Sequence, residues 1–413
     1  IKQPNYDVMR PAETQKDEAM AQPSRETLNS AGELREGLAG TTIPKTFAKL
    51  YSQHTRLGTG ERGLVNWTKA ETTECLDDAL RLLEAAFAER EGGSDNWRES
   101  VRRTGEILEW LSHPQLNVDG LPTRFLAAAA YQLAGYPARS RGLLNADSGE
   151  EDESDILKFL LKAEFPNLLS EISKYWAKIV SPKSNELSLS WQNSDELNTN
   201  LQQRILRETI SALGILCATM RWGDEPRLET AIAKLRSVRN VLVHGDDPYS
   251  WLLAKLCVEI AIIYTRTSMR YNLIPLAEKM TSTGKVALER YLRQGYRSDK
   301  ALAWHSQAKG IEKLVGEHSF VLCTPTGSGK TTIAELAILQ SLFSGSTEDQ
   351  SLLTQKNSAS LAIYLVPSRA LAAEVEAKLS RVLRNLNEPP INITGLYGGT
   401  DWGPTDAWLT SDN

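Results

Sequence analysis

One stretch of the sequence has the residue types and the spacing of a phosphate-binding loop, Thr324-Pro-Thr-Gly-Ser-Gly-Lys-Thr331. Glycines in such a turn let backbone N–H groups point at an anion, and the helix that follows adds its N-terminal dipole. Lys330 would reach the β- and γ-phosphates of a nucleotide, and the Thr331 hydroxyl would bind Mg²⁺. We therefore predict an ATP·Mg²⁺ site in which Lys330 and Thr331 are catalytic. The predicted nucleotide-binding residues of this loop are Thr326, Gly327, Ser328, Gly329, Lys330, Thr331 and Thr332.

The segments on either side of the loop are those that a phosphate site requires. Phe320–Cys323 is a short apolar run that predicts a buried parallel strand, and the apolar residues of Ile333–Leu339 predict a helix packed on a sheet. The strict motif has Gly where this sequence has Thr324, a position that nucleic-acid translocases often fill with Ala, Ser, Cys or Thr. A chance Gly-Lys-Thr in a loop is the alternative, but it does not explain the flanking strand and helix.

Three further groups of residues are candidates for the same site. The Gln307 side chain has a donor and an acceptor, so it can bind adenine with two hydrogen bonds. Leu361–Val366 predicts a second buried strand, which leads into Ser368 and Arg369 at the start of a helix. The carboxyl ends of parallel strands are where ligands bind, and we predict that Ser368 and Arg369 contact the phosphates of a nucleic-acid strand.

A third predicted strand, Ile391–Tyr397, ends at Gly398 and Gly399. Two glycines at a strand end let another backbone come close, so we include both in the predicted nucleic-acid surface. A simple tight turn is an equally good interpretation of this pair.

Composition places the chain among ordinary globular proteins with two or three domains. It has 413 residues, of which 41% are hydrophobic and 24% charged, and its net charge is −5. Nucleic acid must therefore bind to a local basic track. No apolar run approaches the ~20 residues that span a bilayer. Four scattered cysteines predict buried thiols in a reducing cytoplasm: Cys75, Cys217, Cys257 and Cys323.

Most of the chain before the loop has helical periodicity. In the region 46–146, helices are predicted to end at Gly92-Gly93, before Pro114 and at Gly135, and the next begins at Pro137. An alanine-rich segment there resembles one hairpin of a tetratricopeptide array, but an irregular helical bundle explains the pattern equally simply. His244 falls in a predicted loop.

The pattern divides the chain into an all-helical N-terminal region and a parallel α/β domain. The predicted divisions are a polar arm at 1–45 with one short helix around Glu26–Leu38, helical regions at 46–146 and 156–272, an acidic linker at 147–155, a connecting segment at 273–300 and the α/β domain at 301–413. Arg290, Arg293 and Arg297 in the connecting segment share one helix face, which is either a backbone contact for nucleic acid or a solvated surface.

These motifs, in this order, resemble those of superfamily 2 helicases. Gln307 corresponds to the Q-like motif, Thr324–Thr331 to motif I, Pro367-Ser-Arg-Ala-Leu-Ala372 to motif Ia and Gly398-Gly399 to motif Ib. The wording of motif Ia is similar to that of the Ski2-like branch among DEAD/DEAH proteins. The resemblance implies a RecA-like domain that binds ATP and Mg²⁺ and contacts nucleic acid.

The long helical region before such a motor is also similar to the helicase subunits of the Hachiman anti-phage defence system. That resemblance implies a cytoplasmic protein that acts on DNA, in preference to RNA, together with a small nuclease-type effector. The sequence shows no Asp-Glu box and no second RecA-like domain, so we expect this chain alone to bind nucleotide with little or no hydrolysis. The rival hypothesis is an ATP-switched adaptor whose helical region docks an effector protein.

Overall fold

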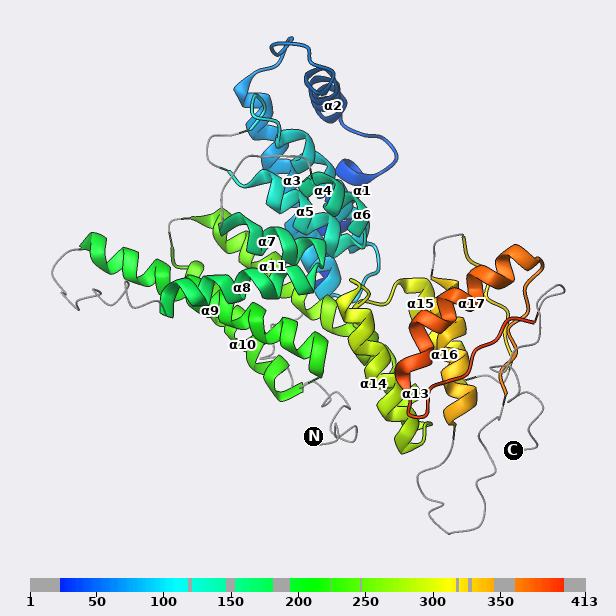
Figure 1. Cartoon of the computed structure of the whole chain (residues 1–413). Coiled ribbons are helices and arrows are strands. Elements are labelled where there is room, and N and C mark those ends of the chain that lie inside the picture. The colour runs from blue at the N-terminus through cyan, green and yellow to red at the C-terminus, as the bar shows by residue number, and fades with distance from the viewer. Residues whose placement is uncertain are drawn as a thin grey trace. The chain divides into compact units, whose positions relative to one another are not determined.

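The computed structural model of the chain contains two compact units (Figure 1). Among the described residues, unit 1 comprises Met220–Gly223 and 265–396, and unit 2 comprises 23–219 and 225–264. The structure describes residues 23–117, 121–145, 153–180, 194–223, 225–245, 247–316, 319–325, 329–344 and 361–396.

The described part of unit 2 is helical. Its helices are α1 (Arg25–Ala39), α2 (Lys45–Gly58), α3 (Lys69–Glu91), α4 (Trp97–Leu111), α5 (Thr123–Ala134), α6 (Pro137–Asn145), α7 (Glu153–Lys162), α8 (Phe165–Val180), α9 (Ser194–Trp222), α10 (Glu225–Leu242) and α11 (Pro248–Thr267), of which α9 and α11 each extend a few residues into unit 1. Each of the helices α3 to α7 packs against the next helix in the chain. Helix α1 packs on α3, so the predicted polar arm is folded at this point.

Local sequence signals explain where these helices begin and end. Helix α3 starts with a capping box between Thr68 and Glu71 and ends at Gly92, as predicted. Helix α5 ends at Gly135, whose φ of 90° is the left-handed conformation that favours glycine. The predicted helix start at Pro137 is also confirmed. His244 lies between α10 and α11, in the predicted loop.

The core of unit 2 forms where α4 and α5 cross closely. The four alanines of Ala127–Ala130 are fully buried, and small side chains let helix backbones approach each other. Gly105 of α4 faces the ring of Tyr131 so closely that a β-carbon there would lie 3.0 Å from it. Helix lengths range from 29 residues in α9 to 9 in α6, which favours an irregular bundle over a constant repeat.

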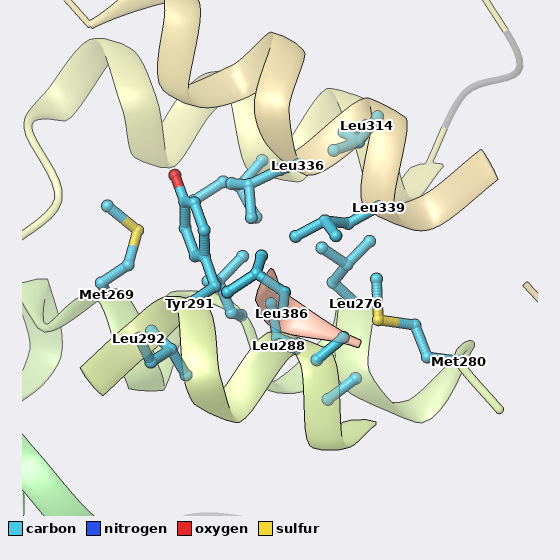
Figure 2. Packing of buried hydrophobic residues seen from close by; sticks show 14 of the residues in the cluster. Met269, Leu276, Met280, Leu288, Tyr291, Leu292, Leu314, Leu336, Leu339 and Leu386 are labelled. Atoms are coloured by element: carbon cyan, nitrogen blue, oxygen red, sulfur yellow. The ribbon is translucent and has the colours of Figure 1, made fainter. Parts of the chain in front are cut away.

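Unit 1 contains a shorter set of helices around one apolar core. They are α12 (Met269–Asn272), α13 (Ile274–Glu278), α14 (Ser282–Arg297), α15 (His305–Gly316), α16 (Lys330–Phe343), α17 (Arg369–Leu383) and the 3₁₀ turn η3 (Arg384–Leu386). Figure 2 shows Leu288 and Tyr291 of α14 in the same cluster as Leu336 and Leu339 of α16. The helix predicted after the phosphate loop is therefore confirmed, with its apolar side in the core.

The predicted parallel sheet is not confirmed. In the described residues, β pairing is limited to isolated antiparallel bridges, Ser268 with Leu302 and Met280 with Ser344. The described residues of the three predicted strand segments carry no strand pairing, and the burial predicted for the first two segments is wrong on one side. Val321 is 87% exposed, whereas its neighbours Phe320 and Leu322 pack on the unit 1 core.

The other two predicted strand segments are also exposed on part of their surface. Leu365 is 87% exposed, while Ile391 and Ile393 pack on the unit 1 core. A parallel strand is buried only when both of its faces are covered, and the described helices of unit 1 cover one face. This accounts for the exposed side of each segment.

The four cysteines divide into two kinds of environment. Cys75, Cys217 and Cys257 are buried, and desolvation raises the pKa of the Cys75 and Cys257 thiols to about 12. Cys323 is exposed, so its predicted burial is wrong. Like Val321, it lies on the side of its segment that the described helices of unit 1 do not cover. None of the helices that the structure describes has both the length and the apolarity to cross a membrane.

Candidate functional site

The start of α15 fixes Gln307 against the end of the phosphate loop. Gln307 Oε1 accepts a hydrogen bond of 2.8 Å from the backbone N–H of Trp304, which is half of a capping box. Its amide end lies against Gly329, where a β-carbon would be 2.2 Å from Nε2. Any larger residue at position 329 would displace this side chain. The structure thus brings together two residues that the sequence predicted for one site.

Gly329 also sets the direction of α16. Its φ of 83° lies in the left-handed region, so both the backbone conformation and the contact with Gln307 require glycine. A second glycine, Gly310 of α15, lets α15 approach α16 because a β-carbon there would lie 2.8 Å from Ile333. The N-terminus of α16 is therefore held beside Gln307.

The Lys330 side chain folds back over the loop. Its ammonium group donates to the carbonyl oxygens of Thr324 and Pro325, the latter at 3.2 Å. Lys330 is exposed, and Thr331 and Thr332 are half-buried on the first turn of α16. Thr326, Gly327 and Ser328 lie outside the described residues. Lys330 and Gln307 thus both lie beside Gly329, Lys330 as the next residue in the chain and Gln307 by direct contact.

A buried polar contact lies on the core side of the same helix. Glu335 of α16 is 5% exposed and accepts a hydrogen bond of 2.7 Å from the Tyr291 hydroxyl of α14. Burial and the neighbouring Glu335 carboxylate raise the pKa of Tyr291 well above its ordinary value. Neither residue was predicted from the sequence. A lone acidic residue within the apolar run of α16 was the available signal, because a buried carboxylate requires a partner.

The predicted nucleic-acid residues that are described lie at the start of α17. Ser368 is its N-cap and accepts a hydrogen bond of 3.3 Å from the backbone N–H of Leu371. Arg369 is the first residue of the helix, and both side chains are exposed. Gly398 and Gly399 lie outside the described residues.

The candidate basic face of α14 is engaged within unit 1. Arg290 donates to the carbonyl oxygen of Leu386 and to Glu388, each at 3.3 Å. Arg293 pairs with Glu289 at 2.6 Å and stacks on Trp222. These contacts favour a structural role for two of the three arginines.

Two comparisons show which known proteins the sequence resembles. Residues 304–408 match the DEAD/DEAH box helicase family, so the matched segment includes Gln307, the phosphate loop and Ser368. Over 323 residues the chain is 24% identical to the Hachiman protein HamB of Bacillus cereus. That alignment covers 77% of this chain and 26% of the relative, so the chain spans about a quarter of the length of the curated relative it matches. The predicted resemblance to superfamily 2 helicases is confirmed.

Proposed function

We propose that the chain is the N-terminal part of an ATP-dependent superfamily 2 helicase or translocase. The observation that carries this proposal is the arrangement of Lys330, Gly329 and Gln307 at the N-terminus of α16, within the segment that matches the DEAD/DEAH family. Phosphate loops place a lysine and a helix N-terminus in this way against a nucleotide triphosphate. The proposed activity is ATP hydrolysis coupled to movement along nucleic acid.

The residues present fit ATP with Mg²⁺. When bound, the metal would neutralise charge on the transferred phosphoryl group. Lys330 would exchange its loop carbonyl partners for phosphate oxygens, and Thr331 would supply the hydroxyl for the metal. Because a carbonyl oxygen accepts two hydrogen bonds, Gln307 can keep its bond to Trp304 and still accept one from adenine.

We further propose that the track is DNA and the setting anti-phage defence. The similarity to a Hachiman protein supports the defence setting. DNA as the track and an effector protein as partner follow from the family resemblance of the sequence. Ser368 and Arg369 would bind backbone phosphates, because each lies exposed at the N-terminus of α17.

The proposal is tested by ATP turnover of the full-length protein with no nucleic acid, single-stranded DNA, duplex DNA and RNA. Strong stimulation by DNA is the expected result. Stimulation by RNA alone would reject DNA as the track. If ATP binds and no nucleic acid stimulates turnover, the motor is rejected and the ATP-switched adaptor is favoured; capture of the effector by the helical region alone would then test the adaptor.

A further inference from the structure

Helix α14 lies outside the segment that matches the helicase family, yet it packs along α16. At the C-terminal end of α16, the backbone N–H of Thr281 donates to the carbonyl oxygen of Phe343 at 2.9 Å. Gly284 contacts Phe343 so closely that a β-carbon there would lie 2.6 Å from the Phe343 Cβ. This end of the pair is therefore held by a backbone hydrogen bond and a glycine contact.

At the N-terminal end of α16, the contact is polar and buried. Tyr291 donates to Glu335 Oε2 at 2.7 Å. Nearer the start of the same helix, Thr332 donates its backbone N–H to the carbonyl oxygen of Gly329 at 3.0 Å. Tyr291 is thus hydrogen-bonded to α16 one helical turn after Thr331 (Figure 2 shows its place next to Leu336).

The opposite side of α14 is anchored by a buried ion pair. Glu289 receives two hydrogen bonds from Arg270, of 2.6 and 2.8 Å, and a third of 2.6 Å from Arg293. Arg270 also donates to the carbonyl oxygens of Met220 and Arg221, which end α9 within unit 1. A bidentate contact between a guanidinium and a carboxylate fixes the orientation of both groups. Helix α14 is therefore held on this side as well as on the side that faces α16.

We propose that Tyr291 is a positioning residue for the nucleotide site: by holding Glu335 it fixes the N-terminal part of α16, and with it the direction of the Thr331 hydroxyl. This inference rests on the proposed function, because it concerns the metal–phosphate side of the same site. It also makes α14 part of the functional ATP-binding domain. A hydroxyl that points away from its metal position weakens the binding of Mg·ATP more than that of metal-free nucleotide.

The test compares Tyr291→Phe with Tyr264→Phe in the full-length protein. Tyr264 is a matched control from unit 2, since it is also buried and donates a hydrogen bond of 2.8 Å, to the Leu160 carbonyl oxygen. We expect Tyr291→Phe to raise the dissociation constant of Mg·ATP about three- to tenfold, the range of one lost hydrogen bond, and that of metal-free ADP about twofold at most. Tyr264→Phe should change neither constant.

Hydrogen exchange and a conservative variant separate positioning from general destabilisation. Amides of the first turn of α16 should exchange faster in Tyr291→Phe, with the end near Phe343 unchanged. Glu335→Gln keeps an acceptor for Tyr291 and should bind Mg·ATP within about twofold of the unmodified protein. If Tyr291→Phe binds Mg·ATP with the affinity of the unmodified protein, this inference is overturned and the proposed function stands. No Mg·ATP binding by the unmodified protein would overturn the proposed function and this inference with it.

Discussion

The two units bury their apolar residues to different degrees. In α5 of unit 2, Ala127–Ala130 are fully buried, and the preceding helix α4 and the following helix α6 both pack on α5. In unit 1, Val321 and Leu365 are almost wholly exposed, although the residues beside Val321 in sequence pack on a core. The apolar density is similar in both places. The difference lies in the kind of element that each sequence encodes.

A helix forms its backbone hydrogen bonds within its own segment, whereas a strand needs a neighbour. A helix such as α5 is therefore complete once neighbouring helices cover it. The segment before the phosphate loop has no strand pairing, but alternate residues face the core, which is the side-chain pattern of a strand. In unit 1, the contacts that position Gln307, Gly329 and Lys330 therefore come from helices α15 and α16.

The largest effect should come from Lys330→Ala in the full-length protein. Removing the ammonium group leaves no side-chain cation in the loop, and we expect ATP turnover to fall at least about a hundredfold, to background. ATP hydrolysis and circular dichroism are the measurements, and the helical signal should not change. If the nucleotide site lies in unit 1 alone, no matching substitution in unit 2 should cause this loss of ATP turnover.

The control for this variant is Lys309→Ala. Lys309 is also exposed in unit 1, and it pairs with Glu312 on α15 at 3.1 Å, away from the loop. Its turnover should equal that of the unmodified protein. Retained turnover in Lys330→Ala would contradict the assignment of the site.

The next prediction compares the same cavity-forming substitution, leucine to alanine, in the two units. Leu108 of α4 and Leu336 of α16 are both fully buried, so truncation of either to alanine should lower the free energy of unfolding of its own unit by about 2–5 kcal/mol. Hydrogen exchange of each unit measures the loss. Leu336→Ala should also weaken nucleotide binding because α16 carries Lys330. Equal nucleotide affinity in the two variants would remove the functional distinction between the units.

The sequence predicted the local structure around Lys330 better than it predicted the packing of unit 1. Lys330 was expected at a helix start after a glycine turn, and it is the first residue of α16, because that signal is local. The contact of Gln307 with Gly329 and the pair of Tyr291 with Glu335 join residues on different helices. No local spacing determines such contacts. In unit 2, helix ends such as Gly135 were predictable because glycine alone readily adopts the required φ.

A smaller effect is expected on the two sides of one extended segment. Leu322→Asp places a carboxylate against the unit 1 core and should lower the free energy of unfolding of that unit by about 1–3 kcal/mol. Val321→Asp should change that free energy by less than about 0.5 kcal/mol, because Val321 is exposed. Denaturation of this 413-residue chain measures both. Equal losses would show that both sides of the segment are covered in solution.

The smallest effect compares the N-caps of two helices. Thr68 caps α3 in unit 2 and Ser368 caps α17 in unit 1, so alanine at either position should cost about 1 kcal/mol of stability. Aspartate caps as well as serine, so Ser368→Asp should keep the stability that Ser368→Ala loses.

The aspartate variant separates capping from binding. A carboxylate at position 368 repels phosphate, so Ser368→Asp should weaken binding of single-stranded DNA to the full-length protein, while Thr68→Asp should not. Fluorescence anisotropy at fixed salt concentration is the measurement. If Ser368→Asp binds DNA as the unmodified protein does, then Ser368 is a cap like Thr68, and the two units do not differ at their helix N-termini.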